Sequence, residues 1–128
     1  MKRIVFFLII FFNLGSLKSE EIANSIEADK IEYLNLDGNI KAIGSVKIIQ
    51  NEYELNADEI SFNQKNSIIE GSGNITLKKI GGEKILASRI KLSSDLKDGI
   101  IENPTLQTSD GINISSAYAI RTNGNSLI

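Results

Sequence analysis

Two aspartates, Asp29 and Asp58, are the residues whose type and spacing could support catalysis. They occupy the same position in two copies of an Ala-Asp-x-Ile motif that stand 29 residues apart. Two carboxylates brought together could hydrolyse a glycosidic bond, one as the acid and the other as the base or nucleophile. Two similar segments carry Ser88 and Tyr118 at this position, and short polar side chains at a bend commonly bind local backbone groups. We therefore expect both aspartates to be structural.

The composition excludes several other chemistries. The 128 residues include no His, no Cys and no Trp. This excludes a zinc, haem or iron–sulfur site built on His or Cys, and also a Ser-His or Cys-His nucleophile pair. The formal charge of −2 does not provide the basic surface that non-specific nucleic-acid binding requires. We expect no catalytic residue, no metal, no cofactor and no nucleic-acid partner.

The first 19 residues have the layout of a secretory signal peptide. Lys2 and Arg3 precede an unbroken apolar run over residues 4–12, and small residues follow, including Ser16 and Ser19. As a helix rising about 1.5 Å per residue, this run and the residues just after it would span only about half of a ~30 Å hydrocarbon core. We expect cleavage after Ser19 or Ser16 and export of the rest of the chain.

Residues 20–128 are expected to form one β domain. Without the leader they carry eleven basic and sixteen acidic side chains, a formal charge of −5. Apolar residues such as Ile40, Ala42, Val46 and Ile48 share one alternating phase, which is the pattern of a strand with one buried face. Turn signals such as Asp-Gly and Asn-Gly separate these runs at regular distances. Without cysteine, the fold depends on its core and its hydrogen-bond ladder alone.

An internal repeat organises this domain. The motif Ala-x-x-Ile begins at Ala28, Ala57, Ala87 and Ala117, in steps of 29, 30 and 30 residues. A fixed period of about 30 residues indicates one supersecondary unit repeated along an axis, in which each unit buries its apolar face against its neighbours. The unit is long enough for two strands and two turns.

Each Ala-x-x-Ile motif predicts a corner between two layers of sheet. Apolar residues lie two apart up to Ala57, but Ile60 follows after three. Because strand side chains alternate with period two, a three-residue step exchanges the buried face unless the strand bends or bulges there. Stacked corners predict an all-β, V-shaped or roll-like fold of two folded antiparallel sheets with their apolar faces turned inward. The fourth copy departs from this pattern, since Ile112 and Ile114 are out of phase with Ala117.

The ordered series of motifs resembles the OstA-like (organic solvent tolerance) family. The family pattern alternates an Ala-Asp motif that ends in an aromatic residue with a Gly-Asn/Ser-Val motif. The segments that carry it here are 26–33, 42–48, 55–62, 70–75 and 96–99. The family covers the periplasmic lipopolysaccharide-transport protein LptA and the N-terminal domain of the outer-membrane assembly protein LptD. The segment 96–101, with Asp110-Gly111 after it, is more similar to the LptD domain.

The resemblance implies a β-jellyroll, or β-taco, whose apolar interior carries the acyl chains of lipid A without covalent chemistry. Its end strands would pair edge to edge with other LptA-, LptD- or LptC-like domains in a periplasmic bridge to the outer membrane. By motif position, the residues lining the groove would be Val46, Ile48, Leu55, Ala57, Ile60, Phe62, Ile75, Leu77, Ile85, Ile90 and Leu92.

Other interpretations remain open from the sequence. The main alternative is a small exported β-solenoid or adhesin-like repeat with a closed, dry core and no lipid ligand. A further alternative is a carbohydrate-active enzyme that uses Asp29 or Asp58. Because an LptD-like protein would continue into a β-barrel, the chain is interpreted as a stand-alone bridge protein, a truncated product or an excised domain.

Overall fold

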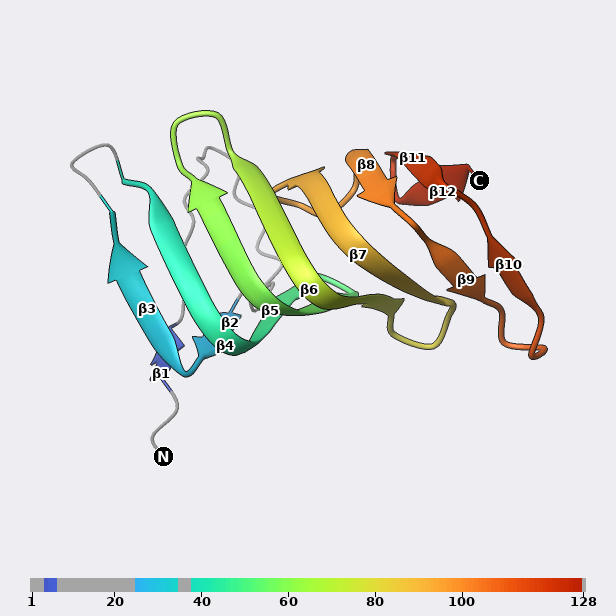
Figure 1. The fold of residues 1–128 in the computed structure, drawn as a ribbon, viewed down its shortest axis with the longest axis horizontal. Coiled ribbons are helices and arrows are strands. Elements are labelled where there is room, and N and C mark those ends of the chain that lie inside the picture. Colours follow the sequence, from blue (N-terminus) through green and yellow to red (C-terminus); the bar gives the residue numbers. More distant parts are fainter. Residues whose placement is uncertain (1–3, 7–24, 35–37, 128) are drawn as a thin grey trace.

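The alternating apolar segments form β-strands that belong to one antiparallel sheet (Figure 1). The computed structural model describes residues 4–6, 25–34 and 38–127, and no helix occurs among them. The strands are β1 (Ile4–Phe6), β2 (Ser25–Ala28), β3 (Lys30–Tyr33), β4 (Ile40–Gln50), β5 (Tyr53–Asn63), β6 (Ile68–Lys79), β7 (Lys84–Ser93), β8 (Gly99–Glu102), β9 (Thr105–Gln107), β10 (Asn113–Ser115), β11 (Tyr118–Thr122) and β12 (Asn125–Leu127). The predicted all-β class is confirmed. The predicted signal peptide lies outside the described residues apart from β1, which pairs with β2.

The four long strands β4 to β7 form the centre of the sheet and bend in the middle. They pair in chain order, and the register of each pairing shifts once, between residues 43 and 46, 56 and 59, and 72 and 75. The pairing is regular on both sides of each shift. A bulge of this kind lets a strand turn sharply while its side chains stay in phase with the core.

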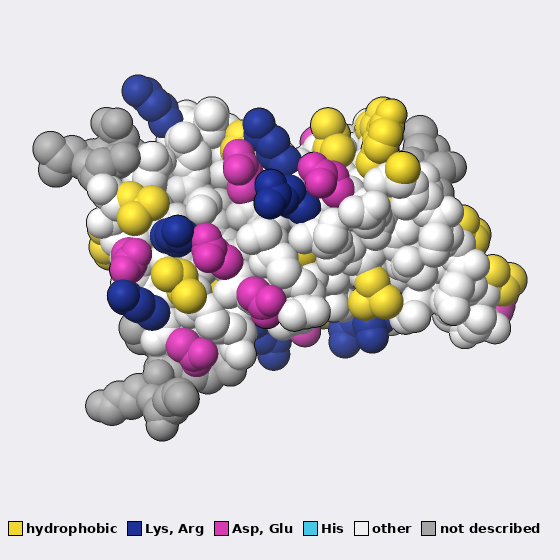
Figure 2. Space-filling model, viewed as in Figure 1, with side chains coloured by type: hydrophobic (Ala, Val, Ile, Leu, Met, Phe, Trp, Pro, Cys, Tyr) yellow, Lys and Arg dark blue, Asp and Glu magenta, His cyan; other side chains and the backbone are white. Residues whose placement is uncertain are grey.

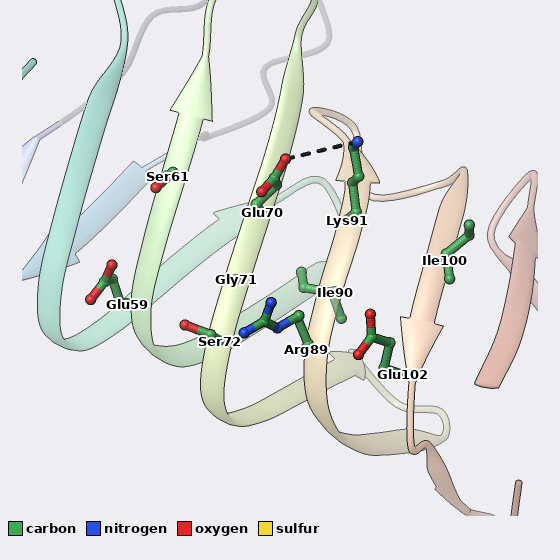
Figure 3. A pocket seen from close by; sticks show the side chains of 10 residues that line it. All are labelled: Glu59, Ser61, Glu70, Gly71, Ser72, Arg89, Ile90, Lys91, Ile100 and Glu102. Carbon is green, nitrogen blue, oxygen red and sulfur yellow. Dashed lines mark ion pairs between the residues drawn. The ribbon is translucent and has the colours of Figure 1, made fainter. Parts of the chain in front are cut away.

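The short strands show that the bends divide the sheet into two layers. β3 pairs with the first half of β4 and β2 with its second half. At the other end, β8 pairs with residues 89–92 of β7 and β9 with residues 84–86. We call the part that contains β3, β8, β11 and β12 layer 1, and the part that contains β1, β2, β9 and β10 layer 2. Each long strand contributes one half to each layer, and Figure 3 shows the central ribbons turning from one layer into the other.

The bends follow one another across neighbouring strands and form a seam along one side of the fold. The seam contains residues 29, 44–45, 58, 73–74, 88 and 103. The opposite side, which we call the mouth, is bordered by the turns at 64–67, 94–98 and 123–124 from layer 1 and at 51–52 and 80–83 from layer 2. The four long strands run without a break through the seam, whereas side chains and turns meet at the mouth.

Three of the Ala-x-x-Ile motifs lie at corners, as predicted, and the fourth copy departs from the pattern, as the phase of Ile112 and Ile114 indicated. Asp29 separates β2 from β3, and Asp58 and Ser88 lie at the register shifts of β5 and β7. In the fourth copy the bend falls before β11, and Ala119 faces the core while Ile120 is exposed. The reason is that irregular residues between β10 and β11 make this bend, so that the alternation restarts with the new strand instead of passing through a bulge.

The inward residues of both layers form rows across the strands, and together they make one core. In layer 1, one row is Ile31, Ala42, Ile60, Gly71, Ile90, Ile101 and Ala119. In layer 2, one row is Ile26, Ile48, Leu55, Leu77, Ile85, Leu106 and Ile114. Buried residues of both layers belong to a single apolar cluster, so the two layers pack directly on each other.

Candidate functional site

All eleven residues predicted to line a groove lie on the inward faces of the two layers. Ten of them have at most 8% of their surface exposed, and Phe62 is partly buried against the same cluster. The structure thus brings together residues from β4, β5, β6 and β7 that the sequence placed in one stripe. The cluster also contains buried residues that the prediction did not include: Ile26, Ala28, Ala42, Tyr53, Ile69, Leu96, Ile101 and Ala119.

The apolar interior reaches the surface at the C-terminal end. The layer 2 row is buried from Ile26 to Ile85, becomes half-buried at Leu106 and ends at Ile114, which is 43% exposed. The neighbouring Ile112 is exposed as well. In Figure 1, β9 and β10 diverge from β11 and β12 at this end. The interior is therefore an apolar core that is buried along its middle and uncovered at one end.

A charged side chain, Arg121, lies among the inward residues at the mouth. It belongs to the layer 1 row that runs through Ile69 and Leu92, and it is only 4% exposed. Its guanidinium lies 4.9 Å from the ring centroid of Tyr53, and its Nε donates a hydrogen bond of 2.7 Å to the carbonyl of Leu96. Arg121 is absent from the residues predicted from the sequence, although alternation from Ala119 would have placed it inward.

The residues around Arg121 shift the pKa of its guanidinium and satisfy its hydrogen-bond donors. Burial lowers the pKa of the guanidinium from its ordinary value, and Tyr53 acts in the opposite direction. Its Nη1 also donates to the hydroxyl of Ser126 at 3.1 Å. An arginine keeps its charge under such conditions, so its donors must be satisfied by carbonyl, hydroxyl and ring partners.

Asp29 and Asp58, the candidate catalytic carboxylates, lie at corners of the seam. Asp58 Oδ2 accepts a hydrogen bond of 2.9 Å from the side chain of Asn74, and its carboxyl group lies against Gly73. Asp29 lies in the same way against Gly44, and its backbone N–H donates to the Gly44 carbonyl at 3.0 Å. These contacts give both aspartates a structural role at the bends.

The outer face of layer 1 is charged over most of its strands and hydrophobic at one end. Figure 2 shows acidic and basic side chains over the part formed by β3 to β7, and hydrophobic side chains gathered at the upper right. Ion pairs join Lys41 to Glu59 at 3.1 Å and Lys91 to Glu70 at 3.9 Å. Exposed pairs of this kind contribute little to stability but keep a sheet face soluble.

A hollow of about 370 Å³ lies on this outer face (Figure 3). Its polar lining includes Glu59, Glu70 and Glu102 together with Arg89 and Lys91. These side chains come from neighbouring strands and belong to the cross-strand ladder of opposite charges. Groups of at least three acidic side chains that could hold a metal ion do not occur within the described residues.

Comparison with protein families identifies this arrangement. The family model described as LptA/(LptD N-terminal domain) LPS transport protein matches residues 25–123, which extend from the start of β2 to the turn before β12. The chain belongs to this family. None of the curated proteins compared with it matches significantly. As the resemblance implied, it is a β-jellyroll protein of a lipopolysaccharide-transport family, and that family is a transport family and not an enzyme family.

The matched region covers the folded roll from β2 to β11. It contains the seam, both inward rows, Arg121 and its partners Tyr53 and Leu96, and it begins after the predicted leader. Within the part of the chain that the structure describes, no helix is long and apolar enough to cross a membrane.

Proposed function

We propose that this LptA/LptD-family domain shelters the acyl chains of lipopolysaccharide in the apolar interior between its two layers. The observation that carries the proposal is the unbroken inward row of layer 2, from Ile26 at one end to the exposed Ile114 at the other. An acyl segment of about ten carbons transferred from water to such a surface gains roughly 8 kcal/mol, at about 0.8 kcal/mol per CH₂. The eleven predicted groove residues are the proposed lining.

Sheltering requires burial and release and no bond-making step. The inward rows consist almost wholly of Ile, Leu, Val, Ala and Phe, with Arg121 at the mouth. Side chains of this kind bind by exclusion of water, which is non-directional and lets a chain slide along the groove. Energy for movement in one direction would come from other components of the transport system.

The ends of the roll are the proposed sites of contact with neighbouring domains. β3 is an edge strand at the N-terminal end and β2 becomes one when the leader is removed, while β10 and β12 form the edges at the C-terminal end. Edge strands of this kind can extend a partner's sheet through main-chain hydrogen bonds. The exposed Ile112 and Ile114 lie where the apolar core of such a neighbour would continue. The family is periplasmic, and we place the exported domain in the bridge to the outer membrane.

A closed structural solenoid is the second candidate. The buried cluster fills the space between the layers, and this observation favours a dry core without a lipid. The two candidates differ in whether the layers separate to admit a ligand.

Photo-crosslinking separates the candidates. A benzoylphenylalanine at Phe62, which is inward and partly buried, should give an adduct with lipopolysaccharide in cells, and one at Ile75 should do the same. The matched controls are Ser61 and Thr76, the outward neighbours on the same strands, which should give none. A folded Phe62 variant without any lipid adduct would favour the closed solenoid.

A further inference from the structure

The two layers touch across the mouth through Tyr53 and Arg121. Tyr53 starts β5 in layer 2, directly after the turn at 51–52, and Arg121 lies in layer 1 just before the turn at 123–124. Both side chains are at most 4% exposed, and the guanidinium lies 4.9 Å from the ring centroid. The contact is therefore shielded from water, where a cation–π interaction is strongest.

The loop at 94–98 holds Arg121 in place. The Leu96 carbonyl accepts its Nε hydrogen bond at 2.7 Å, and the Leu96 side chain is completely buried although its backbone is left-handed, with φ of 65°. The loop is tied down by bonds from the Asp98 backbone N–H to Ser93 Oγ at 3.1 Å and from the Lys97 backbone N–H to Asp95 Oδ1 at 3.0 Å. Such a conformation persists only where the surroundings determine it.

The turn of the last hairpin completes the contact. The Tyr53 hydroxyl lies so close to Gly124 that a Cβ there would overlap it, and the Gly124 backbone N–H donates to the Lys97 carbonyl at 2.9 Å. Three segments far apart in the chain, at 53, 96 and 121–124, thus meet at one point of the mouth. We call Tyr53, Leu96, Arg121 and Gly124 the latch.

We propose that the latch is a lateral gate, which must open for an acyl chain to pass through the mouth and which retains the chain when it closes. This rests on the proposed function. The layers cannot separate at the seam, because four strands run through it, so any widening must occur as a hinge motion that opens the mouth. The latch joins the layers at that side, and it is therefore a contact that such a motion has to break.

Uptake of a fluorescent fatty acid, dansylaminoundecanoic acid, tests the gate in the mature protein. Tyr53→Ala removes the ring and should speed uptake about tenfold, the change expected when a buried cation–π contact is lost. Tyr53→Phe keeps the ring and should stay near the wild-type rate. The matched control is Ile80→Ala, which removes an apolar side chain 65% exposed in a turn on the same border of the mouth.

A reducible tether gives a second test that does not depend on the stability of the Tyr53 variants. Cysteines at Lys79, the cross-strand partner of Tyr53, and at Thr122, next to Arg121, are both exposed, and the chain has no native cysteine. A disulfide-containing bis-maleimide between them should stop uptake, and reduction should restore it. The control tether joins Glu54 to Lys78, which pair within layer 2, and should leave uptake unchanged.

The outcomes separate this inference from the function on which it rests. If no form of the protein takes up the fatty acid, the proposed function fails and the gate fails with it. If the cross-mouth tether leaves uptake at the untethered rate, acyl chains enter through the ends and the gate is overturned, while the groove stands.

Discussion

Replacement of Gly73 by alanine tests how the seam is built. Gly73 has a left-handed φ of 81°, and a Cβ there would lie within 3.0 Å of three atoms of Asp58. Alanine would therefore introduce backbone strain and also displace the carboxylate that accepts the Asn74 hydrogen bond. Both effects act at a bend through which β6 passes from one layer to the other.

The expected loss of stability has two parts. An alanine in the left-handed conformation destabilises the folded state by roughly 1–2 kcal/mol. Alanine also lowers the conformational entropy of the unfolded chain, which offsets up to about 1 kcal/mol of this loss. Displacement of Asp58 by the added Cβ weakens its exposed hydrogen bond with Asn74, and together with the overlap this increases the loss of stability by about 1 kcal/mol. Gly73→Ala should thus destabilise the domain by roughly 2 kcal/mol, or about 8 °C in Tm for a domain of about 100 residues.

Gly81→Ala is the matched control. Gly81 has nearly the same φ, 78°, but a Cβ added there would have no heavy atom within 4 Å beyond its chain neighbours. It should show the backbone part alone, about 1 kcal/mol. Urea unfolding of both variants, and of each in an Asp58→Ala background, measures the difference. Equal losses for Gly73→Ala and Gly81→Ala would refute the idea that the contact with Asp58 fixes the bend.

Two further predictions concern the core and the charged face. Leu55→Ala should lower the free energy of unfolding by roughly 2–5 kcal/mol because Leu55 is completely buried, whereas Ile80→Ala should stay within about 0.5 kcal/mol in the same urea titration. The hydrogen bond and charge of Lys30 hold the pKa of Glu32 below its usual value, so Glu32 favours the fold above that usual value and loses this contribution as the pH falls through the lowered one. NMR titration should show a low carboxyl pKa for Glu32 that rises in Lys30→Gln, and an unchanged value in that variant would contradict the pairing.

Local patterns in the sequence were sufficient to predict most of the fold. The alternation of apolar and polar residues depends only on which face of a strand is exposed to solvent. It correctly predicted that residues such as Leu55 and Ile90 face inward. The three-residue step after Ala57 located a corner because a bulge leaves a direct trace in the phase of apolar residues. The Gly-Ser and Gly-Asn corners of β4 and β6 are visible in the sequence only as a repeat, and their positive φ angles explain why those residues recur.

The contacts at the mouth could not be predicted because they join distant segments. Arg121 meets Leu96, 25 residues earlier, and Tyr53, on a strand that is not its neighbour in the sheet. The local sequence does not indicate these contacts, because they depend on how the two layers twist and cross. The sequence showed that the fourth copy departs from the pattern, but not that Ala119 would face the core and Ile120 the solvent, because that phase depends on where the irregular bend before β11 ends.

The order of strand pairing has a consequence for how such a protein could change in length. β5 and β6 pair only with their neighbours along the chain, and the seam alternates between a two-residue Gly-Ser or Gly-Asn bend and a bend at a single Asp or Ser. Two strands and their turns thus form a unit that begins and ends in the same register. Duplication of residues 57–86 would add one such unit without disturbing the alternation on either side, so the apolar interior would lengthen in steps of two strands.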